Sequence, residues 1–115
     1  MVHSAGKTFS PEVARALDEC TRCHQICLTG SGHVLRKGGA MADAHHIRLL
    51  SDCVELCQTV SNFLLRGSPF AKRTAELCAE VCRECARELD GSGDPVIQTC
   101  AQACADCAEA CEAVA

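Results

Sequence analysis

Large aromatic side chains and long apolar runs are nearly missing from this sequence. It holds no Trp, no Tyr and three Phe in 115 residues. No apolar run approaches the roughly 18 residues that a membrane-spanning helix needs. The opening segment MVHSAGKTFSPE also lacks the apolar stretch and small-residue cleavage site of a secretory signal. We therefore expect a cytoplasmic chain with no membrane partner.

Clusters of positive charge are also absent. Lys and Arg together number 11 against 15 for Asp and Glu, which gives a formal net charge of −4. Nucleic-acid-binding domains usually carry a basic patch or stacking aromatic residues, and neither pattern is found here. We therefore expect no nucleic-acid partner. The length indicates a single domain over residues 1–115, with residues 1–9 as a mobile tail.

Cysteine is the residue that the sequence has in excess, with 12 positions. The segment CAQACADCAEAC, residues 100–111, spaces its cysteines four, three and four apart. At about 3.6 residues per turn, all four lie within roughly 60° of one another on a helix. The segment is therefore predicted to be an amphipathic helix whose inward face carries thiols in place of Leu or Ile.

Three further helices are predicted before this one. A capping residue followed by a proline at the first helical position starts the first helix at Ser10-Pro11, the third at Ser68-Pro69 and the last at Asp94-Pro95. The breaks are marked by Gly38-Gly39, Gly67 and Gly91-Ser92-Gly93. The expected helices run from Pro11 to Lys37, from about Ala42 to Arg66, from Pro69 to about Leu89, and from Pro95 to the C-terminus.

Four helices with short connections predict an all-α fold, an antiparallel up-down-up-down four-helix bundle with a Cys-lined core. One end of this bundle should hold Cys27, His46, Cys53, Cys85 and Cys100, and the other Cys20, Cys57, Cys78 and Cys111. All 12 cysteines fall at helical three- or four-residue spacing and none lies in a loop. We therefore expect the thiols to fill the bundle axis.

Several roles for such a core can be compared. A pure thiol core would fill less volume than Leu and Ile, and thiols sharing one axis would not define a single disulfide framework. The CTRCH segment at residues 20–24 also matches the haem c attachment pattern, which is short and easily matched by chance in a Cys-rich chain. A redox enzyme needs an exposed, low-pKa Cys, typically at a helix N-terminus, and none of the CxxC pairs is placed there.

A metal site is the stronger interpretation. Zinc tetrathiolates or iron–sulfur clusters would each leave buried negative charge, and the thiols form a line rather than discrete sets of four. Cu(I) prefers thiolate and accepts two sulfurs as ligands. If each sulfur also bridges two ions, there is one monovalent ion per thiolate and the core is neutral. This predicts storage of about one copper per Cys. A zinc-thiolate module and a CxxC redox protein remain the alternatives.

The candidate metal ligands include all the cysteines and two histidines on the thiol-bearing faces. His46 lies near one end of the bundle and His24 on the first helix, while His33, His45 and Met41 are weaker candidates. The predicted set is Cys20, Cys23, Cys27, Cys53, Cys57, Cys78, Cys82, Cys85, Cys100, Cys104, Cys107, Cys111, His46 and His24.

The sequence resembles the bacterial copper storage proteins, Cys-rich four-helix bundle proteins. The segments that carry the resemblance are CTRCHQIC (20–27), HIRLLSDCVELCQT (46–59), LLRGSPF (64–70), CAEVCRECA (78–86) and CAQACADCAEAC (100–111). The resemblance implies a non-enzymatic bundle, usually a homotetramer, that binds many Cu(I) ions along its inside. It also implies a cytosolic store, with copper donor and acceptor proteins that the sequence does not identify.

Two departures from the family pattern fall near the same end of the bundle. Relatives often carry another Cys on the second half of the first helix, where this chain has Val34. They also often carry a His or Met just before the first Cys of the last helix, where this chain has Ile97, Gln98 and Thr99. The resemblance therefore implies fewer coppers here and an altered entrance.

Overall fold

The computed structural model describes residues 9–115, and in that part of the chain every regular element is helical, which confirms the all-α prediction. The elements are α1 (Pro11–Lys37), η1 (Ala40–Ala42, a 3-10 turn), α2 (Ala44–Leu65), α3 (Ala71–Leu89) and α4 (Pro95–Val114). The expected mobile tail, residues 1–9, lies outside the described residues except for Phe9. None of the described helices has the length and hydropathy that a membrane span requires.

Two predicted helix starts are confirmed. The Ser10 side chain accepts a hydrogen bond from the Val13 amide at 3.2 Å, and the Asp94 side chain accepts one from the Val96 amide at 2.9 Å. Each cap precedes a proline at the first helical position, where the missing amide proton costs nothing. The end of α1 was also predicted correctly, because Gly38 follows Lys37 with a positive φ of 73°.

Two other boundaries differ from the prediction. The second helix begins at Ala44 rather than Ala42, because residues 40–42 form the 3-10 turn and Asp43 caps the helix instead. The third begins at Ala71 rather than Pro69. The Ser68 hydroxyl accepts from the Phe70 amide and the Ser68 carbonyl from the Ala71 amide, both at 3.1 Å, so residues 68–70 form a turn.

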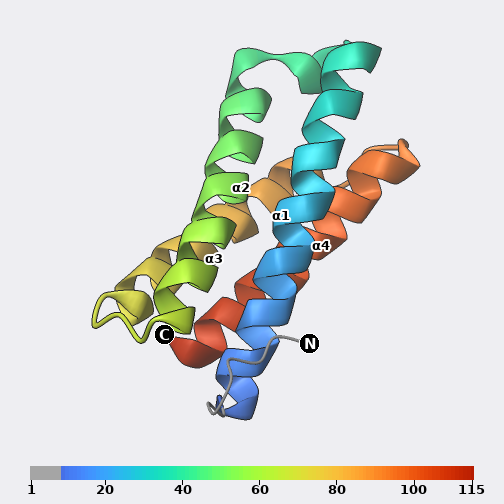
Figure 1. Cartoon of the computed structure of the whole chain (residues 1–115). Helices are drawn as coiled ribbons and strands as arrows, with labels where there is room; N and C mark the ends of the chain where they lie inside the picture. The colour runs from blue at the N-terminus through green and yellow to red at the C-terminus, as the bar shows by residue number, and fades with distance from the viewer. Residues whose placement is uncertain (1–8) are drawn as a thin grey trace.

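The four helices form an antiparallel bundle in which each helix packs against its two neighbours in the order α1, α2, α3, α4 and back to α1 (Figure 1). We call the end with the α1–α2 and α3–α4 connections the upper end, and the end with the α2–α3 connection the lower end. Helix α1 has 27 residues against 19 in α3, so α1 is about 12 Å longer. Figure 1 shows α1 and α2 extending past the α3–α4 connection at the upper end.

Apolar side chains close the core beyond the last thiol at both ends. At the lower end the stripes continue three residues outward to the buried side chains of Leu17, Val60 and Ala75. At the upper end the buried side chains are those of Val34, Leu50, Leu89 and Ile97. The thiols therefore lie between two layers of buried apolar side chains.

Candidate metal centre

All 12 cysteines lie in the core of the bundle, and each is at most 1% exposed. They are free thiols, and they come from all four helices. The expectation that thiols would line the bundle axis is confirmed. Because the stripe on each helix repeats every three or four residues, the inward face of the helix carries sulfur from one apolar layer to the other.

The sulfur atoms form a continuous network along this axis. Every cysteine except Cys85 and Cys100 takes part in an Sγ–Sγ contact of 3.5–4.0 Å, and most contacts join two helices. The contacts that join two helices are Cys20–Cys107, Cys20–Cys111, Cys23–Cys53, Cys23–Cys104, Cys27–Cys104, Cys53–Cys82, Cys53–Cys104, Cys57–Cys78, Cys57–Cys82 and Cys57–Cys107.

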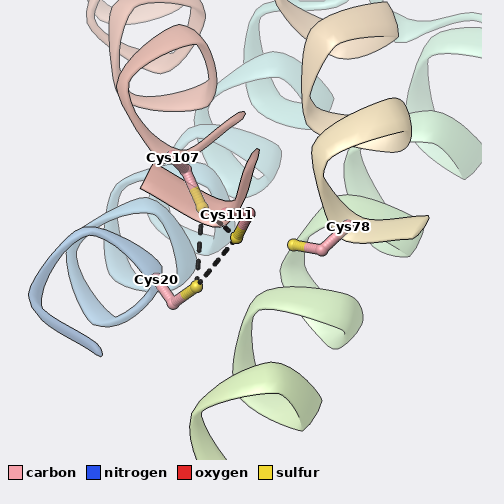
Figure 2. A group of neighbouring side chains, drawn as sticks. All are labelled: Cys20, Cys78, Cys107 and Cys111. Atoms are coloured by element: carbon pink, nitrogen blue, oxygen red, sulfur yellow. Dashed lines mark hydrogen bonds between the residues drawn. The ribbon is translucent and has the colours of Figure 1, made fainter. Parts of the chain in front are cut away.

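The lower end of the network is a compact group of four thiols, which we call the lower quartet: Cys20, Cys78, Cys107 and Cys111. Their sulfur atoms all lie within 4.8 Å of one another. Figure 2 shows the sulfurs turned toward a common centre from α1, α3 and α4. Cys20 contacts both Cys107 and Cys111 at 3.6 Å. Three further groups of four thiols meet the same criterion, and one of them shares Cys78 and Cys107 with the lower quartet.

The upper end is organised differently. Cys85 and Cys100 belong to none of the four groups, although both are buried. The Cys100 thiol contacts the backbone carbonyl of Ile26 on α1 at 3.7 Å. The Cys27 thiol lies 4.0 Å from the Cys100 carbonyl and 3.5 Å from the Cys104 sulfur. At the upper end of the thiol column, the Cys100 sulfur of α4 therefore packs against the backbone of α1.

Hydrogen bonds between thiols separate the groups that ionise readily from those that do not. The pKa of Cys20 is lowered to about 6, chiefly because Cys107 and Cys111 donate hydrogen bonds to its thiolate. The pKa of Cys85 is lowered to about 5 by the neighbouring thiols of Cys104 and Cys53. The pKa of Cys104 is correspondingly raised, since it donates to several neighbours and is buried. Hydrogen bonds from neighbouring thiols therefore favour the thiolate form at some cysteines and oppose it at others.

His46 stands above the thiols at the upper end, on the first turn of α2. Its Nδ1 lies 2.7 Å from Asp43 Oδ1, and the same oxygen accepts a hydrogen bond from the His46 amide at 2.9 Å. Because the carboxylate can only accept, Nδ1 carries a proton, so Nε2 is the nitrogen with the lone pair in the neutral ring. A carboxylate holding the second nitrogen is the usual support of a ligating histidine. The sequence analysis did not identify Asp43, although an Asp directly before a helix is a common N-cap.

The other predicted candidates outside the cysteines lie apart from the thiol groups. His24 is half-buried between α1 and α2, with Nδ1 3.1 Å from the Val54 carbonyl, so its Nε2 is the nitrogen left for another partner. His45 lies 2.8 Å from Glu88 and His33 2.7 Å from Asp94. Met41 packs partly buried against the core at the upper end. Among residues 9–115, no histidine belongs to a compact thiol group.

The CxxC pairs do not have the setting of a redox centre. Each lies inside a helix, and the thiols that touch within a helix are instead four residues apart. These contacts are Cys23–Cys27 at 3.8 Å, Cys78–Cys82 at 3.8 Å and Cys107–Cys111 at 4.0 Å. Reactive CxxC cysteines are partly exposed at helix N-termini, whereas all of these are buried.

Comparisons with known proteins agree with this geometry. Residues 10–115 match the family model described as "Copper storage protein". A Nitrosospira multiformis protein of known crystal structure is 36% identical, covers 90% of this chain and 94% of its own, and superposes with a TM-score of 0.84. The Cu(I)-bound copper storage protein BsCsp3 is 28% identical over 90% of this chain and 98% of its own, with a TM-score of 0.85.

The copper-free form of copper storage protein 3 from Bacillus subtilis is also similar, with 28% identity over 88% of this chain and 96% of its own and a TM-score of 0.78. No curated protein sequence matches this chain. The family model covers the whole described bundle except Phe9, and a bundle lined with thiols along its full axis is what a copper storage protein requires. The chain belongs to the copper storage protein family.

Proposed function

We propose that this chain stores copper as Cu(I) on the thiolates of its core. The observation that carries the proposal is the continuous network of sulfur contacts of 3.5–4.0 Å between the two apolar layers. Cu(I) is soft and selects thiolate, and a sulfur that bridges two ions serves a line of metals. All ligand positions are occupied by protein sulfur, so the core has no open position for a substrate. The role is therefore storage rather than catalysis.

All 12 cysteines are the proposed ligands, and His46 is an accessory ligand at the upper end. Two observations support His46. Asp43 holds its Nδ1, so Nε2 is the nitrogen left to ligate when the ring is neutral. His46 also lies near enough to Cys85 that its protonated form lowers the pKa of that thiol. His24 is proposed as a weaker accessory ligand through Nε2, since its Nδ1 lies against the Val54 carbonyl.

Zinc is the second candidate cargo, and the lower quartet is the observation that favours it. A tetrahedral zinc with Zn–S bonds of about 2.3 Å has sulfurs about 3.8 Å apart. The Sγ–Sγ contacts of 3.6 Å and 4.0 Å in this group lie close to that value. However, zinc bound to four thiolates leaves two negative charges in a buried core, which monovalent copper avoids.

Two finer features of the function are also proposed. We propose a cytoplasmic location, because 12 free thiols and Cu(I) both require a reducing compartment. We also propose a homotetramer, supported by apolar side chains on the outside of the bundle, including Leu77 at 48% and Leu35 at 60% exposure. Cell fractionation tests the first proposal, and light scattering on the purified chain tests the second.

The main experiment is an anaerobic titration of the fully reduced protein with Cu(I) against a chromophoric chelator, with Zn²⁺ titrated in parallel. Storage predicts tight uptake of about one copper per cysteine and little retained zinc. Saturation near three metals per chain, with zinc held as tightly as copper, would instead establish discrete tetrathiolate sites.

A pair of neighbouring histidines tests the accessory ligand in the same titration. His46→Ala should slow copper uptake and remove the weakest-bound copper. His45→Ala is the matched control, because His45 is exposed and paired with Glu88. Identical titration curves for the two variants would exclude His46 as a ligand.

A further inference from the structure

We propose that Gly30 is a positioning residue for the Cys100 thiol, and that its missing side chain is what places this sulfur at the upper end of the thiol column. The inference rests on the proposed function, since Cys100 is one of the proposed copper ligands. It concerns the one position on the inward stripe of α1 that carries neither a thiol nor an apolar side chain.

The spacing of α1 shows that Gly30 belongs to the metal-binding face. Cys20, Cys23 and Cys27 are three and four residues apart, and the same rhythm continues to Gly30 and then to Val34. On the other three helices the position three or four residues beyond the uppermost thiol holds a large apolar side chain: Leu50, Leu89 and Ile97. On α1 that position holds a buried glycine in the middle of a helix.

The room that a side chain at residue 30 would need is filled by sulfur. A Cβ built on Gly30 would lie 2.3 Å from the Cys100 Sγ, far inside van der Waals contact. The same sulfur contacts the Ile26 carbonyl, one turn earlier on α1, at 3.7 Å. The Cys100 thiol therefore sits directly against the backbone of α1, in a seat formed by Ile26 and Gly30.

Backbone conformation does not explain the glycine. The residues with positive φ in the described chain are Gly38, Gly39, Gly67 and Gly91, so Gly30 has ordinary helical geometry. In such a helix Ala is preferred to Gly. Gly32, on the same helix, provides a contrast, because its Cβ would meet only the flexible tip of Arg36 at 3.2 Å. The lower helix propensity of glycine at residue 30 is therefore explained by the space that it leaves for the Cys100 thiol.

The seat matters for copper because of where it points Cys100. Cys27 and Cys100 approach each other across the α1–α4 interface, with the Cys27 thiol 4.0 Å from the Cys100 carbonyl. Cys27 in turn contacts Cys104 at 3.5 Å, which links this corner to the rest of the network. A methyl group at residue 30 would force the Cys100 thiol into another rotamer and detach it from this corner.

The experiment compares five reduced proteins: the unmodified chain, Gly30→Ala, Cys100→Ala, the double variant and Gly32→Ala as control. Copper capacity is measured by Cu(I) titration against a chelator, and the melting temperature of the copper-free form by calorimetry. We expect Cys100→Ala and Gly30→Ala each to lose about one copper. The double variant should lose no more than either single variant, whereas Gly32→Ala should keep the full capacity.

The melting temperatures provide a readout that is independent of copper. Gly30→Ala should lower the melting temperature of the unmodified chain, because a methyl group and the Cys100 sulfur compete for one space. Once Cys100→Ala has removed that sulfur, the same change should raise it by about 3–6 °C, the ordinary gain from Gly to Ala in a helix. Gly32→Ala should show a similar gain in the otherwise unmodified chain, where no sulfur opposes the added methyl group.

Each alternative result is decisive. Full copper capacity in Gly30→Ala, or copper losses that add in the double variant, would overturn the positioning role. The same sign of thermal shift in both backgrounds would overturn the seat itself. If even the unmodified chain took up no copper, the proposed function would fail. The reversal of the thermal shift would still decide whether Gly30 accommodates Cys100.

Discussion

The two ends of the thiol column are built differently, although both are sealed by apolar side chains. At the lower end, Cys20, Cys78, Cys107 and Cys111 form a compact quartet whose sulfurs face a common centre. At the upper end, Cys85 and Cys100 stand outside every such group, and Cys100 is seated against the backbone of α1. The upper end also carries His46 and Asp43, while the lower quartet is made of thiols alone.

This difference indicates a division of labour along one axis. A preformed group of four sulfurs binds a soft cation with little rearrangement, so the lower end should hold copper most tightly. The upper end, where ligands are dispersed and a histidine stands above the thiols, is suited to admitting and passing on metal. Two experiments below separate these roles, and a third compares the ion pairs at the two ends.

The largest effects are expected from the apolar layers. Leu50 lies on α2 between His46 and Cys53, and Leu17 lies one turn below Cys20; each is 1% exposed. Leu50→Ala and Leu17→Ala should each lower the free energy of unfolding by about 2–4 kcal/mol. Stopped-flow uptake of Cu(I) should become several-fold faster in Leu50→Ala only. Equal acceleration in both variants would show that metal enters from both ends.

A smaller effect is expected from removing two thiols at either end. Cys107→Ser with Cys111→Ser, and Cys85→Ser with Cys100→Ser, should each cost about two coppers at saturation. At low copper, the lower-end variant should compete about tenfold less well with a chelator, which corresponds to about 1.4 kcal/mol. The upper-end variant should match the unmodified chain there. If the two variants compete equally, the quartet has no special affinity.

The smallest effect concerns an anchor that is found at the upper end. Asp94 accepts hydrogen bonds from His33 at 2.7 Å and Lys37 at 2.6 Å while it caps α4. These contacts, His33 first, hold the pKa of Asp94 well below its usual range. Its stabilisation is therefore complete above the usual carboxyl pKa, near 4, and is lost as the pH falls below it.

Asp94→Asn keeps a good capping residue but removes the charge. The melting temperature of the variant should fall below that of the unmodified chain by a few degrees at pH 7. The gap should narrow as the pH falls from about 4. Glu112→Gln is the control at the lower end, since its pair with Arg83 is about half exposed and worth little. A gap that stays constant down to pH 3 would contradict this account.

The cysteine spacing, the Ser-Pro and Asp-Pro helix starts and the glycine breaks are local signals, and they were enough to predict the bundle and the burial of the thiols. The start of α3 was missed because Ser68-Pro69 can open a helix or form a turn, and the hydrogen bonds of residues 68–70 decide for the turn. The role of Gly30 was missed for another reason. In the sequence, Gly30 is visible only as a residue that destabilises its own helix, whereas Cys100, the residue that it accommodates, lies 70 residues away on α4.

The partition of thiols into a quartet and a dispersed end could not be predicted either. It depends on the axial offset and rotation of each helix against its neighbours. The helix connections predicted that Cys20, Cys78 and Cys111 share one end, and all three lie in the lower quartet. The exact offset of the helices decides that Cys107, rather than Cys57, is its fourth member.

The sulfur network also bears on how such a protein is degraded. Most of its contacts join different helices, so copper bound between the sulfurs would cross-link α1, α2, α3 and α4. Such binding stabilises the folded state against the unfolded state that a protease cleaves. A loaded chain would have to release its metal before it could unfold and be cleaved. The lifetime of the protein would then depend on its copper content, and copper-free chains would be degraded before loaded ones.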